Sequence, residues 1–182
     1  MKTKSTQLLK ELTANTENHI KRVSAFLEMS DEHLNQRPGP KSWTVLECIE
    51  HLNRYGDYYI PAMRERMEAD SKPAAELFKS GLLGNYFANT MLPKAKMKKM
   101  STFKDKNPLG SALNKSTIRR FNQQQLDMLE LLELAENKNL NSIKIPITIT
   151  RFIKFKLGDT FRFLIYHNER HIQQAERVVK GG

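Results

Sequence analysis

The sequence predicts an all-α protein, a bundle of four long helices with a long irregular arm between the second helix and the third. Two observations favour this class. Four stretches of the chain repeat apolar residues three and four positions apart, which is the spacing of a helix with one buried face. The arm is instead interrupted by proline and glycine. A chain of 182 residues suits one domain with a substantial core, so residues 1–182 are expected to form a single domain.

The first helix is predicted over about residues 5–29. Its apolar positions share one face and are Leu8, Leu9, Leu12, Ile20, Val23, Phe26 and Leu27. Ser30 is then a candidate N-cap for a short turn that extends to Leu34. The segment Arg37-Pro-Gly-Pro ends this turn, because proline cannot continue a helix.

The second helix is predicted to open at a capping box, in which Thr44 caps the helix and Glu47 reaches back to the Thr44 backbone. Proline in a helix interior removes a backbone donor, so Pro61 is expected to kink this helix. The apolar pattern fades near Met67. The predicted inward face carries Val45, Cys48, Ile49, Leu52, Tyr55 and Tyr59.

The irregular arm covers residues 70–110. Six prolines and glycines exclude one regular helix there: Pro73, Gly81, Gly84, Pro93, Pro108 and Gly110. A short helix over residues 75–80 is expected within it.

The third helix is predicted over about residues 111–136. Its expected inward residues are Leu113, Ile118, Phe121, Leu126, Leu129 and Leu132. Residues 137–157 follow, where isoleucine alternates with other residues from Ile143 to Ile149, as in a β-strand. Pro146 and the lack of a clear pairing partner favour an extended segment packed on the helices instead.

The fourth helix is predicted over about residues 159–179, with Asp159 as its N-cap. It carries His167 and His171, and residues four apart on a helix have Cβ atoms about 5–6 Å apart. Two imidazoles at that spacing can bind one divalent metal ion without distorting the backbone. Two surface histidines are the alternative. An inward-turning stripe favours the metal site: Leu164, His167, His171, Gln174 and Val178.

His51 on the second helix is a third candidate ligand. Three neutral imidazoles would leave a divalent ion with an open position, which is the layout of a catalytic site that activates a water or a thiol. A surface or hydrogen-bonded core histidine is the alternative for His51. Gln174 either orients a ligand or is solvated. Because imidazole must be neutral to bind, metal release is expected on acidification through a pKa of about 6.5.

The net charge of +10 raises the possibility of nucleic-acid binding. Half of this excess is one local run, since residues 94–106 hold six lysines and a single acid, Asp105. No zinc-finger spacing and no aromatic RNA-binding motif accompanies the run. A solvated basic loop is therefore favoured over a phosphate-binding patch, and no specific nucleic-acid partner is expected.

A cytoplasmic location is expected. The single Cys48 cannot form an internal disulfide, and the first residues, Met1–Gln7, lack an apolar signal core. No run of about 18 apolar residues exists, so no membrane partner is expected.

Two segments together resemble the DinB/YfiT superfamily, also called the DinB-like four-helix bundle. The first is Pro40-Lys-Ser-Trp-Thr-Val-Leu-Glu-Cys-Ile-Glu-His-Leu52 at the start of the second helix, and the second is His167-Asn-Glu-Arg-His-Ile-Gln-Gln174. The resemblance covers nearly the whole chain. It implies that His51, His167 and His171 bind a divalent ion, nickel or zinc.

The resemblance also implies a reaction, because characterised relatives include transferases that join a low-molecular-weight thiol to an electrophile. Such a thiol and an electrophilic small molecule are thus the expected partners, and a second copy of the chain is a further candidate. Two other functions stay open, a metal-dependent hydrolase at the same site and a non-catalytic binding protein that uses the basic arm. The sequence shows no general base and no thiol-recognition motif. The arm at 70–110 is longer than in simpler relatives and is expected to cover or reshape the pocket.

Overall fold

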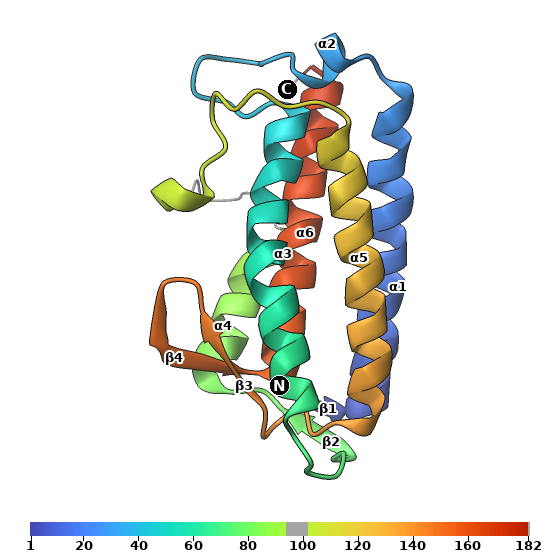
Figure 1. The fold of residues 1–182 in the computed structure, drawn as a ribbon, viewed down its shortest axis with the longest axis vertical. Coiled ribbons are helices and arrows are strands. Elements are labelled where there is room, and N and C mark those ends of the chain that lie inside the picture. The colour runs from blue at the N-terminus through green and yellow to red at the C-terminus, as the bar shows by residue number, and fades with distance from the viewer. Residues whose placement is uncertain (94–101, 182) are drawn as a thin grey trace.

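The computed structural model describes residues 1–93 and 102–181. Within these residues the protein is mostly helical, with two small antiparallel strand pairs beside the helices (Figure 1). The predicted helical class is confirmed, and the strand pairs are an addition to it. No helix of the described part is long and apolar enough to cross a membrane.

The described chain forms the α-helices α1 (Ser5–Ser24), α2 (Asp31–Leu34), α3 (Val45–Glu68), α4 (Leu82–Met91), α5 (Ser116–Leu134) and α6 (Leu157–Val179). Short 3-10 helices are η1 (Ala25–Glu28), η2 (Lys104–Lys106) and η3 (Ala135–Asn137). The strands are β1 (Lys2–Lys4), β2 (Leu77–Lys79), β3 (Lys144–Ile147) and β4 (Thr150–Lys156).

The four long helices run side by side along the long axis of the molecule, with α1 and α3 each packed against both α5 and α6 (Figure 1). Their apolar faces enclose two buried clusters. One includes Leu12, Met63, Leu132 and Phe161, and the other includes Val23, Ile49, Phe121 and Ala175. One predicted inward residue is wrong, because Leu126 is 48% exposed.

The predicted capping box at the start of α3 is confirmed. The Glu47 amide donates to Thr44 Oγ1 at 3.1 Å, and the Thr44 amide donates to Glu47 Oε2 at 2.9 Å. The same carboxylate also accepts from Arg37 at 2.7 Å and from the Gly110 amide at 2.6 Å. Glu47 therefore fixes the arm to the beginning of α3. The helix then continues through Pro61 to Glu68 without a break.

The predicted short helix at residues 75–80 is wrong. That segment contains β2, which pairs with the N-terminal strand β1 in the register Thr3 opposite Phe78. Phe78 is fully buried while Leu77 is exposed, which is the alternation of a strand with one face on the core. The helix in this region is α4, which begins after Gly81.

The prediction of an unpaired extended segment at 137–157 is also wrong. Strands β3 and β4 form an antiparallel hairpin, so the partner of the first half of the segment is its second half. Pro146 is accommodated beside a shift in register between Pro146 and Ile147, where an irregular ladder tolerates a missing donor. Ile145 and Phe155 lie opposite each other and both are buried.

Asp159 is not the N-cap of α6, because the helix begins at Leu157 with Lys156 in the cap position. The fully buried Asp159 carboxylate accepts instead from the Gly81 amide at 2.8 Å, from the Ser80 hydroxyl, and from Arg162 at 3.2 Å. Arg162 also donates at 3.1 Å to the side-chain oxygens of Asn85 and Asn89 on α4. This buried network holds α4 against α6.

Candidate metal centre

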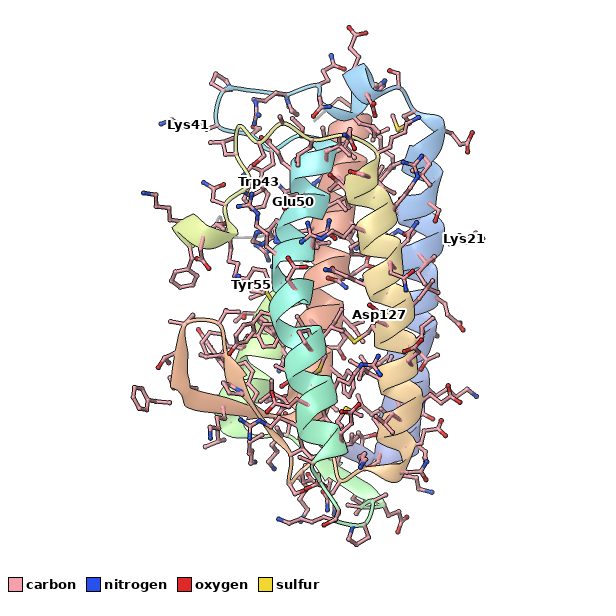
Figure 2. All side chains as sticks on the ribbon, in the orientation of Figure 1. Lys21, Lys41, Trp43, Glu50, Tyr55 and Asp127 are labelled. Atoms are coloured by element: carbon pink, nitrogen blue, oxygen red, sulfur yellow. The ribbon has the colours of Figure 1, made fainter. Side chains whose placement is uncertain are left out.

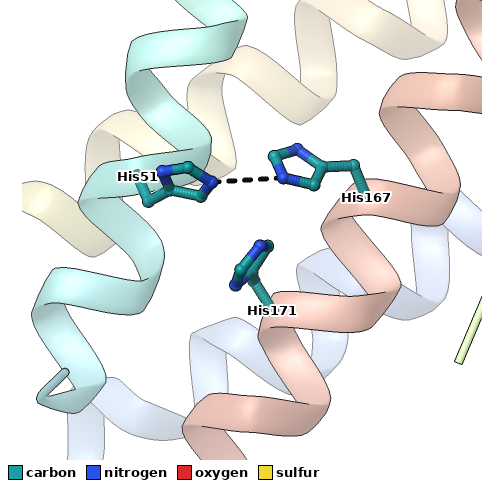
Figure 3. A group of neighbouring side chains, drawn as sticks. All are labelled: His51, His167 and His171. Atoms are coloured by element: carbon teal, nitrogen blue, oxygen red, sulfur yellow. Dashed lines mark hydrogen bonds between the residues drawn. The ribbon is translucent and has the colours of Figure 1, made fainter. Parts of the chain in front are cut away.

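His51, His167 and His171 lie together between α3 and α6, with their rings turned toward one another (Figure 3). One ligand nitrogen from each ring falls within 4.8 Å of the others. His51 Nε2 is 3.1 Å from His167 Nε2, and both side chains are buried. The predicted gathering of these three histidines is therefore present in the structure. Their role as metal ligands remains a prediction.

The position of the cluster follows from the two helices. His167 and His171 project from successive turns of α6, as their spacing requires. His51 lies on α3, which packs directly against α6 (Figure 3). The histidines lie where the two apolar clusters of the core meet. On α3, Leu52 belongs to one cluster and Tyr55 packs against the other; on α6, Ile172 and Ile165 are divided between the clusters in the same way.

Hydrogen bonds orient two of the three rings. His51 Nδ1 is 2.8 Å from the Lys106 carbonyl oxygen, which can only accept, so Nδ1 carries the proton and Nε2 is left with a lone pair. His171 Nδ1 is 2.9 Å from Gln174 Oε1, an arrangement that frees Nε2 in the same way. Metal-binding histidines usually have such partners on the nitrogen that does not bind the ion. The prediction that Gln174 orients a ligand fits this contact.

Sequence reasoning did not identify Lys106. Its contribution to the site is a backbone carbonyl in η2, and a carbonyl leaves no side-chain signal in the sequence. Lys106 lies at the end of the predicted basic run. Its Nζ donates to the Arg54 carbonyl at 3.1 Å, which fastens η2 to α3 beside the site. Lysines 94, 96, 98 and 99 of that run lie outside the described residues.

The third ring, that of His167, is compatible with either a proton or a metal ion between it and His51. His167 Nδ1 is buried and has no hydrogen-bond partner among the described residues. Its Nε2 faces the lone pair of His51 Nε2, so the two nitrogens must share either a proton or a cation to avoid repulsion. Three nitrogen donors that converge in this way fit a divalent ion of the zinc or nickel type.

Burial keeps the three rings neutral. It lowers the pKa of His51 to about 4 and is the main cause that lowers the pKa of His167 and of His171 well below the ordinary value. The neighbouring histidines and Arg170 lower the pKa of His167 further. Neutral imidazoles are the form that binds metal, so the site needs no deprotonation at pH 7.

We expect metal retention to persist below the pH anticipated from the sequence. Histidine titrates near pH 6.5 in an unfolded chain, whereas the pKa of folded His51 is about 4. The unfolded chain thus binds more protons between these values, and the free energy of unfolding decreases as the pH falls through this window. Dialysis against metal-free buffer followed by elemental analysis should show bound ion at pH 5.5 and loss toward pH 4. A release midpoint near pH 6.5 with the fold intact would contradict this.

The histidines face a cavity of about 780 Å³. Aromatic side chains flank them within it. The Trp43 ring centroid lies 4.7 Å from that of His51, and the Tyr55 ring lies 4.6 Å from that of His167 (Trp43 and Tyr55 are labelled in Figure 2). Burial raises the pKa of Tyr55 to about 12, so its phenol is neutral and can donate a hydrogen bond. The described residues that line the cavity include no aspartate and no glutamate.

Three other side chains of types that can bind metal or act as nucleophiles lie outside the site. Cys48 is fully buried, which raises the pKa of its thiol and makes it a core residue rather than a nucleophile. His19 Nε2 bonds to Glu169 at 2.9 Å between α1 and α6, and His33 is exposed on α2.

Comparison with known proteins gives the family. A model of the DinB superfamily matches residues 9–175, which is most of the chain and includes all three clustered histidines. Searches of curated proteins and of solved structures found no match. On the strength of the family match, the chain belongs to the DinB superfamily.

Proposed function

We propose that this protein is a divalent-metal-dependent enzyme that transfers a low-molecular-weight thiol to an electrophilic small molecule. His51, His167 and His171 would hold the ion, which is nickel or zinc. The observation that carries the proposal is the convergence of three neutral imidazoles, with ligand atoms within 4.8 Å of one another, on a cavity large enough for a substrate.

Three neutral nitrogen donors would leave the ion its full charge and an open position, where a bound thiol is deprotonated outright. This chemistry matches a cavity that offers no carboxylate as a general base among its described residues. A metal ion in the same kind of site would lower the pKa of a bound water to about 7, so a hydrolase remains the alternative.

The chain's own residues would position and isolate the reactants. The Lys106 carbonyl and Gln174 hold two of the rings in place. The neutral Tyr55 phenol can donate a hydrogen bond to a substrate or leaving group. Arg170 and Arg177 line the cavity on the α6 side and favour a ligand with an anionic group.

Four further proposals concern the protein as a whole. The four long helices form the DinB-like four-helix bundle, and residues 1–182 form one domain, which the family match over residues 9–175 supports. The protein acts in the cytoplasm, where low-molecular-weight thiols are reduced. A homodimer is its proposed assembly.

Metal analysis and a conjugation assay test the function. Purified protein, stripped with a chelator and reloaded with zinc or nickel, should bind one ion per chain. The loaded protein should then accelerate the reaction of cysteine or another small thiol with benzyl chloride, and the stripped protein should not. The His33→Ala variant, which changes an exposed histidine outside the cluster, is the matched control and should behave as the wild type. Absence of bound metal would refute the proposal, and metal-dependent ester hydrolysis without thiol transfer would establish the hydrolase instead.

A further inference from the structure

The cavity at the histidines differs in chemistry along its length. It follows α6 from Phe163 to Val178, which corresponds to roughly 22 Å of helix. Two cationic residues, Lys41 and Arg177, line it toward the C-terminal end of α6, and Arg170 lines it at the level of the histidines. Lys41 and Trp43 lie near the start of α3, and Tyr55 is farther along that helix toward the hairpin (Figure 2).

The other end of the cavity is apolar. We call it the aromatic compartment, and its walls are Tyr59, Phe87, Met91, Ile147, Phe155 and Phe163. The ring centroids of Phe155 and Phe163 lie 6.0 Å apart, and those of Phe87 and Phe155 lie 5.6 Å apart. The Tyr59 hydroxyl accepts from the Thr148 amide at 3.2 Å, and Thr148, which also lines the cavity, carries the other hydroxyl at this end.

The compartment adjoins the metal centre directly. The Phe163 ring stacks on the His167 ring, with centroids 5.8 Å apart and an angle of 10° between the planes. A group held among these aromatic side chains would therefore lie next to the histidines. Since none of the six wall residues is charged, a charged group entering this end would lose its hydration without compensation.

Elements outside the four long helices build much of this wall. Phe87 and Met91 belong to α4, while Ile147 and Phe155 belong to the β3–β4 hairpin. The buried network of Asp159 and Arg162 fixes α4 on α6. The arm and the extended segment of the sequence thus supply a shaped wall rather than a solvated connection.

We propose that the aromatic compartment binds the uncharged aryl or alkyl part of the electrophilic substrate, with Phe87 and Phe155 as specificity-determining residues. The identification of the ligand as an electrophilic substrate rests on the proposed thiol transfer. The binding of an apolar group, by contrast, can be measured without any reaction. Apolar walls with few polar groups are typical of pockets that take such ligands.

Binding of N-phenyl-1-naphthylamine, an uncharged aromatic dye that fluoresces in apolar surroundings, tests the compartment on metal-free and metal-loaded protein alike. The wild type should bind it saturably. Phe87→Asp places a charge in the wall and should weaken binding at least about tenfold. The matched control is Tyr86→Asp, since Tyr86 is the adjacent residue of α4, is 63% exposed and does not line the cavity, so its affinity should stay within about twofold.

Thermal melting verifies that each variant is folded. If Phe87→Asp does not fold, Met91→Gln introduces an uncharged amide into the same wall and should also weaken dye binding. No saturable dye binding to the wild type, or an unchanged affinity in folded Phe87→Asp or Met91→Gln protein, would overturn the inference.

An activity measurement separates this inference from the proposed function. With loaded protein and cysteine, the ratio of kcat/KM for benzyl chloride to that for chloroacetamide should fall at least about tenfold in Phe87→Asp, because only the aryl group needs the compartment. Dye binding that behaves as expected without any thiol transfer would support the compartment and refute the reaction. Thiol transfer by a protein that does not bind the dye would refute the compartment alone.

Discussion

Replacing His167 by alanine should weaken the binding of zinc or nickel by more than about 100-fold, since the loss of an outer partner of a ligand alone costs about 10- to 100-fold. The His167 ring faces both other rings, with centroids 5.0 Å from that of His51 and 4.7 Å from that of His171. Its removal leaves one ligand on each helix and opens the centre of the cluster. Metal titration with a competing chelator measures the affinity.

Metal should also stabilise the wild type and not the variant. An ion that binds only the folded state raises the melting temperature, by an amount that grows with the ratio of free ion to dissociation constant. His167→Ala should therefore melt at the same temperature with and without added ion, while the exposed His33→Ala control keeps the wild-type shift. If His167→Ala still bound one ion per chain as tightly as the wild type, the ion would bind elsewhere.

Replacing Asp159 by alanine should lower the free energy of unfolding by about 3–5 kcal/mol, the usual effect of breaking a buried ion pair. The Asp159 side chain is fully buried and that of Arg162 is 3% exposed, so the guanidinium would keep its buried charge without its carboxylate. Total stabilities of about 5–15 kcal/mol make this loss severe. Urea denaturation measures it.

A surface ion pair provides the control for this prediction. Asp57 pairs with Arg120, and their side chains are 49% and 43% exposed. Asp57→Ala should cost no more than about 1 kcal/mol because water solvates the remaining charge. Asp159→Ala should also loosen α4 and weaken dye binding in the aromatic compartment. Equal losses of stability in the two variants would show that the buried pair has no special role.

The sequence alone determined the features that depend on neighbouring residues. Apolar spacing located the long helices, and the Thr44 and Glu47 capping box fixed the beginning of α3. The helical spacing of four pointed to His167 and His171, and the resemblance to the DinB family supported His51 as the third candidate ligand. Each of these signals is local, because a helix and its cap are built from contacts between residues three and four positions apart.

Only the tertiary structure decided features that join distant parts of the chain. Aspartate is a favoured N-cap residue, yet the Asp159 carboxylate accepts hydrogen bonds from Gly81 and Arg162 inside the fold and does not cap the helix. The hairpin partner of β3 depended on how the chain turns after Ile147. The Lys106 carbonyl comes to His51 from 55 positions away, and no local pattern records that contact. Hydrogen bonds and burial between such segments are set by packing, so the cavity walls become visible only when the helices are assembled.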